Sequence, residues 1–190
     1  MEPKRREALI EATIAEVGAV GLVEVTVGRI AKRAGVSTAL AHHYFGSKAE
    51  ILAAAMRRIL ADYGRSVRER TRAAREPRER LQAIIEASFD DNQFEPAVVS
   101  AWLAFYVEAE RSAAAKRILK VYIRRLDSNL VHALRELVAE PAARRIARGL
   151  GSMIDGVYLR AALRDGPPQA PQAVALVSEY LDLMLEKETA

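Results

Sequence analysis

The chain contains no cysteine, and this absence removes several kinds of site at once. Without thiols there is no disulfide framework, no thiolate nucleophile, and no zinc or iron–sulfur site with cysteine ligands. Apolar runs are only a few residues long, and Met1 leads into the charged residues Glu2, Lys4, Arg5 and Arg6. This pattern predicts neither a membrane span nor a secretory signal. We therefore expect a cytoplasmic protein with no membrane partner.

Strand patterns are also scarce. Only Val23, Val25 and Val27 alternate with polar residues, and a strand there would have no partner elsewhere in the chain. No glycine occurs between Gly64 and Gly149, and most apolar residues recur at intervals of three and four. The chain has 190 residues, 51% of them hydrophobic, which is enough for one or two domains. We predict an all-α fold of about nine helices.

The chain also lacks a large excess of either charge, except in one short segment where basic residues predominate. The chain has 29 Lys and Arg against 25 Asp and Glu. Between Val25 and Lys48 lie four basic residues and no acid, so the rest of the chain is balanced. Proteins that bind a polyanion usually carry a basic segment of this kind. A basic segment by itself, however, is more often a solvated face of the protein. Charge alone leaves both interpretations open.

Helix signals within this segment predict two short helices joined by a turn. Thr26 is a suitable N-cap for a helix over about residues 27–34, and Gly35 supplies the left-handed residue that ends it. Ser37 then caps a second helix that runs to Tyr44. Two short helices around a glycine turn form a helix-turn-helix, whose second helix enters the major groove of DNA.

The string IAKRAGVSTALAHHYFGSK, residues 30–48, resembles the signature of the tetracycline-repressor (TetR) family of bacterial transcription regulators. The resemblance implies a three-helix DNA-binding domain over residues 1–47, with the helix-turn-helix at 26–45. Residues 48–190 would then form a helical bundle that binds an effector and makes a homodimer on double-stranded operator DNA. The DNA-facing residues implied in this way are Thr26, Arg29, Thr38, Ala39, His42, His43, Tyr44 and Lys48. A tyrosine is common in the family at the position of His42, so the chain departs from the pattern there.

Two other functional classes remain as alternatives. A helical-bundle enzyme would rely on Asp90, Asp91 and Glu95, but the chain has no Glu-x-x-His pair, catalytic cysteine or phosphate loop. The adjacent His42 and His43 lack a nearby third metal ligand. We therefore predict no catalytic residue, no cofactor and no metal. An adaptor that binds another protein is the second alternative, and it would leave no sequence-specific footprint on DNA.

Aromatic residues are few, but they are clustered: seven of the eleven lie between Phe89 and Tyr158. Such a cluster is either core packing, which spacing alone favours, or the wall of a pocket for a small organic ligand. Four strings in this part, FDDNQF, AWLAFY, RRLDSNLV and IDGVYLRAAL, are similar to a narrower group of TetR-family proteins, the choline-responsive repressors of glycine betaine synthesis genes.

That second resemblance implies release from the operator by choline. Proteins hold a quaternary ammonium with aromatic faces, because it has no hydrogen to donate. The effector-binding residues predicted on this basis are Phe89, Asp91, Trp102, Phe105, Tyr106, Tyr122, Asn129, Asp155 and Tyr158. A TetR-family repressor with a different lipophilic or cationic effector is the alternative.

The last two predicted helices, at about residues 142–164 and 171–186, have broad apolar faces and include Gly149, Gly151, Gly156 and Ala161. Two such hairpins from two subunits form a four-helix interface, in which small residues permit close crossings. A monomeric core would show the same spacing, and the family resemblance is what implies a homodimer through these helices.

Overall fold

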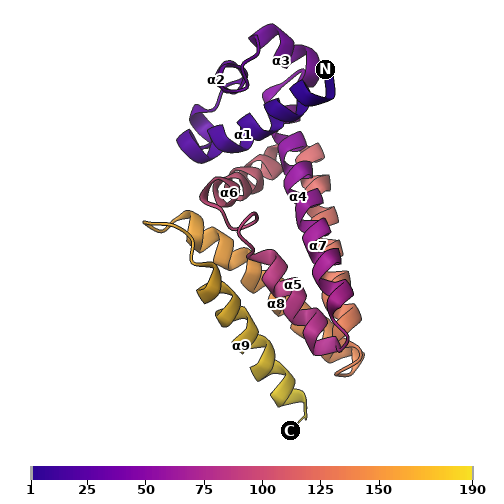
Figure 1. The fold of residues 1–190 in the computed structure, drawn as a ribbon. Coiled ribbons are helices and arrows are strands. Elements are labelled where there is room, and N and C mark those ends of the chain that lie inside the picture. The colour runs from indigo at the N-terminus through magenta and orange to yellow at the C-terminus, as the bar shows by residue number, and fades with distance from the viewer. Residues whose placement is uncertain (1, 190) are drawn as a thin grey trace. The chain divides into compact units, whose positions relative to one another are not determined.

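The computed structural model describes residues 2–189, and within that range every regular element is a helix. The all-α fold and the predicted number of helices are confirmed for the described residues. The alternating valines form no strand. Val23 and Val27 lie in two successive helices, and Val25 is buried in the link between them. The helices are α1 (Glu2–Glu24), α2 (Val27–Arg33), α3 (Thr38–Phe45), α4 (Lys48–Ala73), α5 (Pro77–Ser88), α6 (Pro96–Arg111), α7 (Ala113–Leu134), α8 (Glu140–Ala162) and α9 (Ala170–Thr189) (Figure 1).

The two helices of the helix-turn-helix begin after the predicted N-caps and end within one residue of the predicted ends. Thr26 Oγ1 accepts a hydrogen bond from the backbone N–H of Arg29 at 3.2 Å, so Thr26 caps α2. Gly35 follows α2 with φ 67°, a left-handed conformation that glycine adopts without steric cost. Ser37 Oγ accepts from the N–H of Leu40 at 3.2 Å and caps α3. These three local signals therefore fix the turn between the two helices.

Contacts divide the chain into two compact units. One comprises the chain up to Ala61 together with Glu95–Leu119, and the other comprises Asp62–Phe94 and the chain from Lys120 onward. Helices α4 and α7 each contribute residues to both units, whereas α6 belongs to the first. This division differs from the predicted functional boundary after residue 47, because α6 packs with the helices that precede that boundary.

In the first unit α1 packs against α2 and α6 (Figure 1). Gly18 permits the close approach of α1 to α6, since a Cβ added there would lie 2.6 Å from the Cα of Ala97. The buried apolar side chains of this unit include Leu9, Val17, Ile30, Ile51, Met56 and Phe105, which come from α1, α2, α4 and α6. The helices of the predicted DNA-binding domain therefore share one core with a helix far along the chain.

In the second unit α9 packs against α8 and α5. A Cβ added at Gly149 would overlap the hydroxyl of Tyr180, so this glycine makes room for a side chain of α9 in the same chain. The aliphatic side chains in the core of the unit include Leu81, Ile85, Leu130, Leu134, Ile146, Leu150, Ile154, Val177 and Leu181. Close packing of α8 with α9 is thus one use of the small residues that the sequence analysis assigned to a dimer interface.

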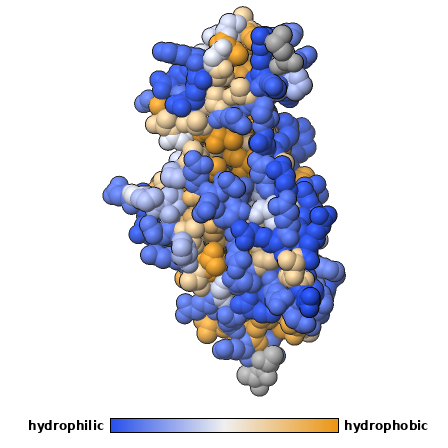
Figure 2. All heavy atoms as spheres, in the orientation of Figure 1, coloured by the Kyte–Doolittle hydropathy of each residue, from blue (hydrophilic) through white to orange (hydrophobic). Residues whose placement is uncertain are grey.

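Hydrophilic residues cover most of the face drawn in Figure 2, and hydrophobic residues appear between them in smaller patches. None of the helices within residues 2–189 combines the length and the apolar character that crossing a bilayer requires. The second unit nevertheless exposes several large apolar side chains at the end of α8 and on α9, namely Leu159, Leu163, Leu176 and Leu183.

Candidate DNA-binding and effector sites

Helix α3 has one buried side and one exposed side. Ala41 and Phe45 are buried and attach the helix to the first unit. Of the residues predicted to face DNA, Thr38, Ala39, His42 and His43 are exposed, and Tyr44 is half-buried. Because the early residues of a recognition helix reach the base edges in the major groove, Thr38 and Ala39 occupy the positions that this role requires.

His42 has a local partner at the end of α3. Its Nδ1 lies 2.8 Å from the carbonyl oxygen of Gly46. Since a carbonyl oxygen only accepts hydrogen bonds, Nδ1 carries the proton and donates it. This bond closes the last turn of α3 and gives His42 a structural role at the position where the chain departs from the common family pattern.

The start of α4 is fixed by a reciprocal cap. Ser47 Oγ accepts a hydrogen bond from the N–H of Glu50 at 3.2 Å, and Glu50 Oε2 accepts one from the N–H of Ser47 at 3.3 Å. Lys48, the half-buried first residue of α4, therefore has a defined backbone position beside the recognition helix. Thr26, the other candidate at a helix start, is exposed and uses its hydroxyl oxygen as the cap of α2.

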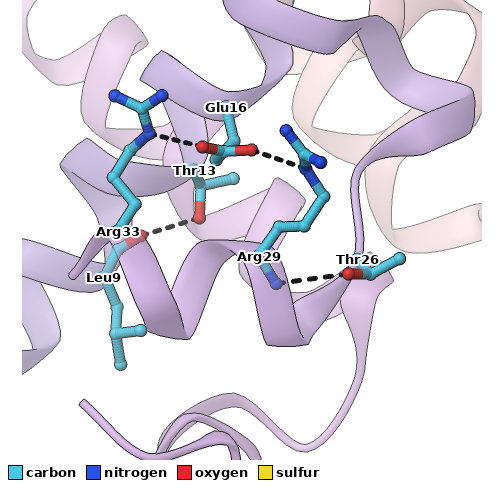
Figure 3. Close-up of polar contacts among 6 residues, drawn as sticks. All are labelled: Leu9, Thr13, Glu16, Thr26, Arg29 and Arg33. Atoms are coloured by element: carbon cyan, nitrogen blue, oxygen red, sulfur yellow. Dashed lines mark hydrogen bonds and ion pairs between the residues drawn. The ribbon is translucent and has the colours of Figure 1, made fainter. Parts of the chain in front are cut away.

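A carboxylate on α1 joins two arginines of α2 (Figure 3). Arg29 Nε donates to Glu16 Oε2 at 2.9 Å, and Arg33 Nε donates to Glu16 Oε1 at 2.5 Å. The side chain of Glu16 is only 6% exposed, whereas those of Arg29 and Arg33 are 48% and 45% exposed. The hydrogen bond from Arg33 lowers the pKa of Glu16 most, burial raises it, and the bond from Arg29 lowers it further.

Of these three residues, only Arg29 was predicted from the sequence to face DNA, and the contact with Arg33 and Glu16 was not predicted. Arg29 and Arg33 stand four residues apart on one short helix, and this spacing indicates that they share one face of it. Nothing local in the sequence links Glu16 to either arginine, because the contact depends on how α1 packs against α2.

Two of the predicted effector residues meet in the second unit. Tyr122 Oη donates to Asp155 Oδ1 at 3.2 Å. The ring of Tyr63 lies edge-on to that of Tyr122, with 6.1 Å between ring centroids. Burial raises the pKa of Tyr63 to about 12, a hydrogen bond with Ser88 opposes this rise, and the carboxylates of Asp155 and Asp90 add to it. Tyr63 is not among the predicted effector residues, because it lies outside the cluster of aromatics along the chain.

Phe89 and Tyr158 belong to a separate aromatic group in the second unit. Phe94 makes edge-to-face contacts with both rings, each at 5.1 Å between centroids. The hydroxyl of Tyr158 donates to the backbone carbonyls of Ser88 at 2.5 Å and Gln93 at 3.0 Å. All three rings are buried. The three rings therefore pack together inside this unit, and an effector-binding role for Phe89 and Tyr158 stays a prediction.

The remaining predicted aromatics lie in the first unit. Trp102 and Tyr106 share a face of α6, with ring centroids 5.8 Å apart. Phe105, on the same helix, is buried and lines an apolar cavity with Val17 and Met56. These three residues therefore lie in the same compact unit as the helix-turn-helix.

The polar candidates are placed differently from the rings. Asp91 is exposed between α5 and α6, and Asn129 is exposed on α7 beside the buried Leu130. Asp90 accepts hydrogen bonds from the hydroxyl of Ser66 at 2.6 Å and from the N–H of Gln93 at 3.0 Å, so it stabilises a turn. In the part of the chain that the structure describes, no three His, Asp or Glu side chains gather into a possible metal site.

Comparison with known proteins identifies both halves of the chain. Residues 9–55 match the family model for bacterial regulatory proteins of the tetR family, and residues 77–186 match the model for the C-terminal part of BetI-type transcriptional repressors. The transcriptional regulator BetI of Brucella melitensis is 48% identical over 185 residues, which cover 97% of this chain and 93% of that protein. BetI of Agrobacterium fabrum is 47% identical over 186 residues, or 98% and 90% of the two chains.

Solved structures share the fold over nearly the whole chain. A putative transcriptional regulator from Pseudomonas aeruginosa has a TM-score of 0.82 and 28% identity, and covers 98% of this chain and 92% of its own. A putative regulator from Saccharomonospora viridis, solved in complex with choline, has a TM-score of 0.80 and 20% identity, with 93% and 95% covered.

The tetR-family match includes all of α2 and α3, so this pair is the DNA-binding helix-turn-helix of the chain. The matched proteins are regulators of transcription and not enzymes, which removes the helical-bundle enzyme from consideration. With one family model over the N-terminal helices, another over most of the rest, and 48% identity along nearly its full length, the chain belongs to the BetI-type repressors of the TetR family.

Proposed function

We propose that this repressor binds a near-palindromic operator as a homodimer in the cytoplasm and is released by choline, which relieves repression of glycine betaine synthesis genes. The functional division predicted from the sequence, with DNA binding in residues 1–47 and effector binding and dimerisation in residues 48–190, is part of this proposal. The BetI-type family match supports it, and the choline complex of the Saccharomonospora viridis protein is a precedent on the same fold.

The observation that carries the effector proposal is the group formed by Tyr63, Tyr122 and Asp155. Two aromatic rings 6.1 Å apart and a carboxylate bonded to one of them are the groups that a quaternary ammonium requires. An ammonium near Asp155 would compete with the hydroxyl of Tyr122 for the carboxylate. Binding would then change the contact between α7 and α8, which carry these two residues. Trp102 and Tyr106 form a second aromatic pair on α6 that the same experiment tests.

The test is a choline titration of the protein bound to a labelled operator fragment, selected by the purified protein from a random-sequence DNA pool. Choline should weaken DNA binding, and each tenfold loss requires about 1.4 kcal/mol of differential choline binding. Replacing one aromatic wall by Tyr122→Leu should raise the choline concentration needed by roughly 2- to 30-fold, since a cation–π contact is worth about 0.5–2 kcal/mol. Trp102→Phe, titrated in parallel, reports on the pair in α6.

Two controls separate a cation site from a merely apolar pocket. The neutral isostere 3,3-dimethylbutanol has the shape of choline without its charge and should leave DNA affinity unchanged. Asp155→Asn should weaken the response to choline while operator affinity without choline persists. Unchanged DNA binding at saturating choline would remove choline as the effector, and an equal response to the isostere would remove the cation site.

The homodimer is proposed to form through α8 and α9. Leu163 and Leu176 are 73% and 51% exposed, so the end of α8 and one side of α9 offer apolar surface to a partner. Gly156 has no atom within 4 Å of an added Cβ, so its face of α8 has room for a close helix crossing. Sedimentation of Leu176→Glu should give monomers, whereas the same substitution at Val23, exposed on α1, should leave the dimer intact.

A further inference from the structure

Among the buried residues that the structure describes, Glu16 is the only one with an acidic or basic side chain of the Asp, Glu, Lys, Arg and His type. Burying a carboxylate has a desolvation cost, and a buried ion pair is often no more stabilising than apolar packing of the same volume. The helix-turn-helix already has an apolar core that includes Ile30, Ala31 and Phe45. The position of Glu16 beneath α2 therefore needs an explanation beyond the stability of the fold.

The geometry of its two hydrogen bonds supplies one. Both arginines donate through Nε, which is the inner nitrogen of the guanidinium group. In Figure 3 the dashed lines join the Nε atom of each arginine to Glu16, and the terminal nitrogens of Arg33 are directed away from the carboxylate. Within residues 2–189 the terminal nitrogens of both arginines make no hydrogen bond of their own, and both side chains are about half exposed. Two donor forks are thus held in place on α2 with their outer ends available.

The carboxylate also offsets the electrostatic repulsion between the two arginines. Arg29 and Arg33 stand one helical turn apart, where like charges repel each other. Glu16 lies between them and attracts both. Free arginine side chains would have to lose rotamer freedom when they bind a phosphate, and the bonds to Glu16 remove much of that freedom beforehand.

We propose that Glu16 is a positioning residue for DNA binding, which sets Arg29 and Arg33 as a preformed pair of donors for phosphates of the operator backbone. Arg33 is then a second phosphate-binding residue beside Arg29. The inference rests on the DNA-facing role proposed for Arg29. Glu16 itself touches no DNA and acts through the two arginines.

The sign of the effect separates positioning from simple charge. Glu16→Gln removes one negative charge next to the DNA-binding helices, and a charge effect alone would strengthen binding and steepen its dependence on salt. Positioning predicts the opposite, because glutamine cannot accept from both arginines with equal strength and its amide group donates toward one of them. Operator binding should therefore weaken although the protein has become more basic.

The experiment measures operator affinity over a range of salt concentrations for Glu16→Gln and for Glu11→Gln. Glu11 lies on the same helix, is exposed, and gives the same change in net charge. Glu16→Gln should weaken binding roughly 5- to 100-fold, the cost of ordering two long side chains on the DNA. Glu11→Gln should bind as the parent does or slightly more tightly. Equal or tighter binding by Glu16→Gln would overturn the proposal.

A mutant cycle excludes a purely structural role. In a protein that already carries Arg29→Ala and Arg33→Ala, Glu16→Gln should have no further effect on DNA binding. The same loss in that background would show that Glu16 acts through the fold of α1 and would overturn the proposal. If the double arginine variant itself binds the operator normally, the DNA-facing assignment of α2 is wrong, which is a different and distinguishable failure.

A second variant covers the case in which Glu16→Gln does not fold, as judged by its helical circular dichroism and melting temperature. Arg29→Lys with Arg33→Lys keeps both charges and Glu16, but a lysine has one ammonium group and cannot bind the carboxylate through one nitrogen and a phosphate through others. This variant should lose affinity with an unchanged choline response. Full affinity of the lysine variant would overturn the proposal.

Discussion

Gly18 is the position at which one added methyl group should test the packing of the first unit. A Cβ at residue 18 would lie 2.6 Å from the Cα and 2.7 Å from the Cβ of Ala97 on α6. Neither atom can move away by a change of side-chain rotamer. The variant Gly18→Ala therefore forces α1 and α6 apart, and the closest packing between these two helices is lost.

Two opposing contributions set the magnitude. Alanine is favoured over glycine inside a helix by roughly 0.5–1 kcal/mol. Overpacking a well-filled contact costs about 1–3 kcal/mol, and a clash with backbone belongs in the upper part of that range. The variant should thus lose about 1–2 kcal/mol in the free energy of unfolding.

Gly64→Ala is the matched control on α4. The nearest atom to its added Cβ is the terminal Nη1 of Arg68 at 3.3 Å, on a flexible side chain that can move. This variant should gain about 0.5–1 kcal/mol. Urea denaturation of both proteins at one fixed protein concentration measures the difference, because dimerisation makes stability depend on concentration. If Gly18→Ala is stabilised as much as Gly64→Ala, the described approach of α1 to α6 is wrong.

Three further outcomes follow from single groups. Ser37→Ala removes the side-chain cap of α3 and should lower the free energy of unfolding by about 0.5–2 kcal/mol, with Ser37→Thr close to the parent in denaturant titrations. Because the folded-state pKa of Glu16 lies below the ordinary value of 4.5, its ion pairs contribute fully above that pH and are lost as the pH falls through the lowered pKa. Acid titrations of stability should therefore be shallower below pH 4.5 for Glu16→Gln than for the parent. Absorbance titration should detect a tyrosine that ionises only at about pH 12, and Tyr63→Phe should remove that step; a step that persists in the variant would contradict the raised pKa of Tyr63.

Local signals predicted the helix-turn-helix closely. Thr26, Gly35 and Ser37 fix its boundaries through hydrogen bonds within four residues and one left-handed backbone conformation, so a short window of sequence is enough to find them. The string that resembles the TetR family covers the same residues, and the comparison with known proteins confirms the family.

Contacts between segments that lie far apart in the sequence could not be predicted from the sequence. The pairing of α1 with α6 depends on the absence of a side chain at Gly18. The residues next to a glycine in a helix do not indicate which other helix packs against it. The same holds for Glu16 and for Tyr63, whose partners lie on other helices. Periodicity also could not show that the rings of Phe89 and Tyr158 stack on each other, because core rings and rings that line a ligand site both recur at helical intervals. The DNA-facing and effector-binding residues, taken one by one, stay predictions.

The division of the chain has a consequence for how the protein is made. The first unit is discontinuous: α1, α2 and α3 leave the ribosome early, but α6, against which α1 packs, ends only at Arg111. At roughly 5–20 residues per second, translation of the intervening chain takes on the order of ten seconds. During that interval the face of α1 that α6 covers, which includes Gly18, is open on the nascent chain. The DNA-binding part is first in the gene, yet it can complete its core only after more than half of the protein has been synthesised.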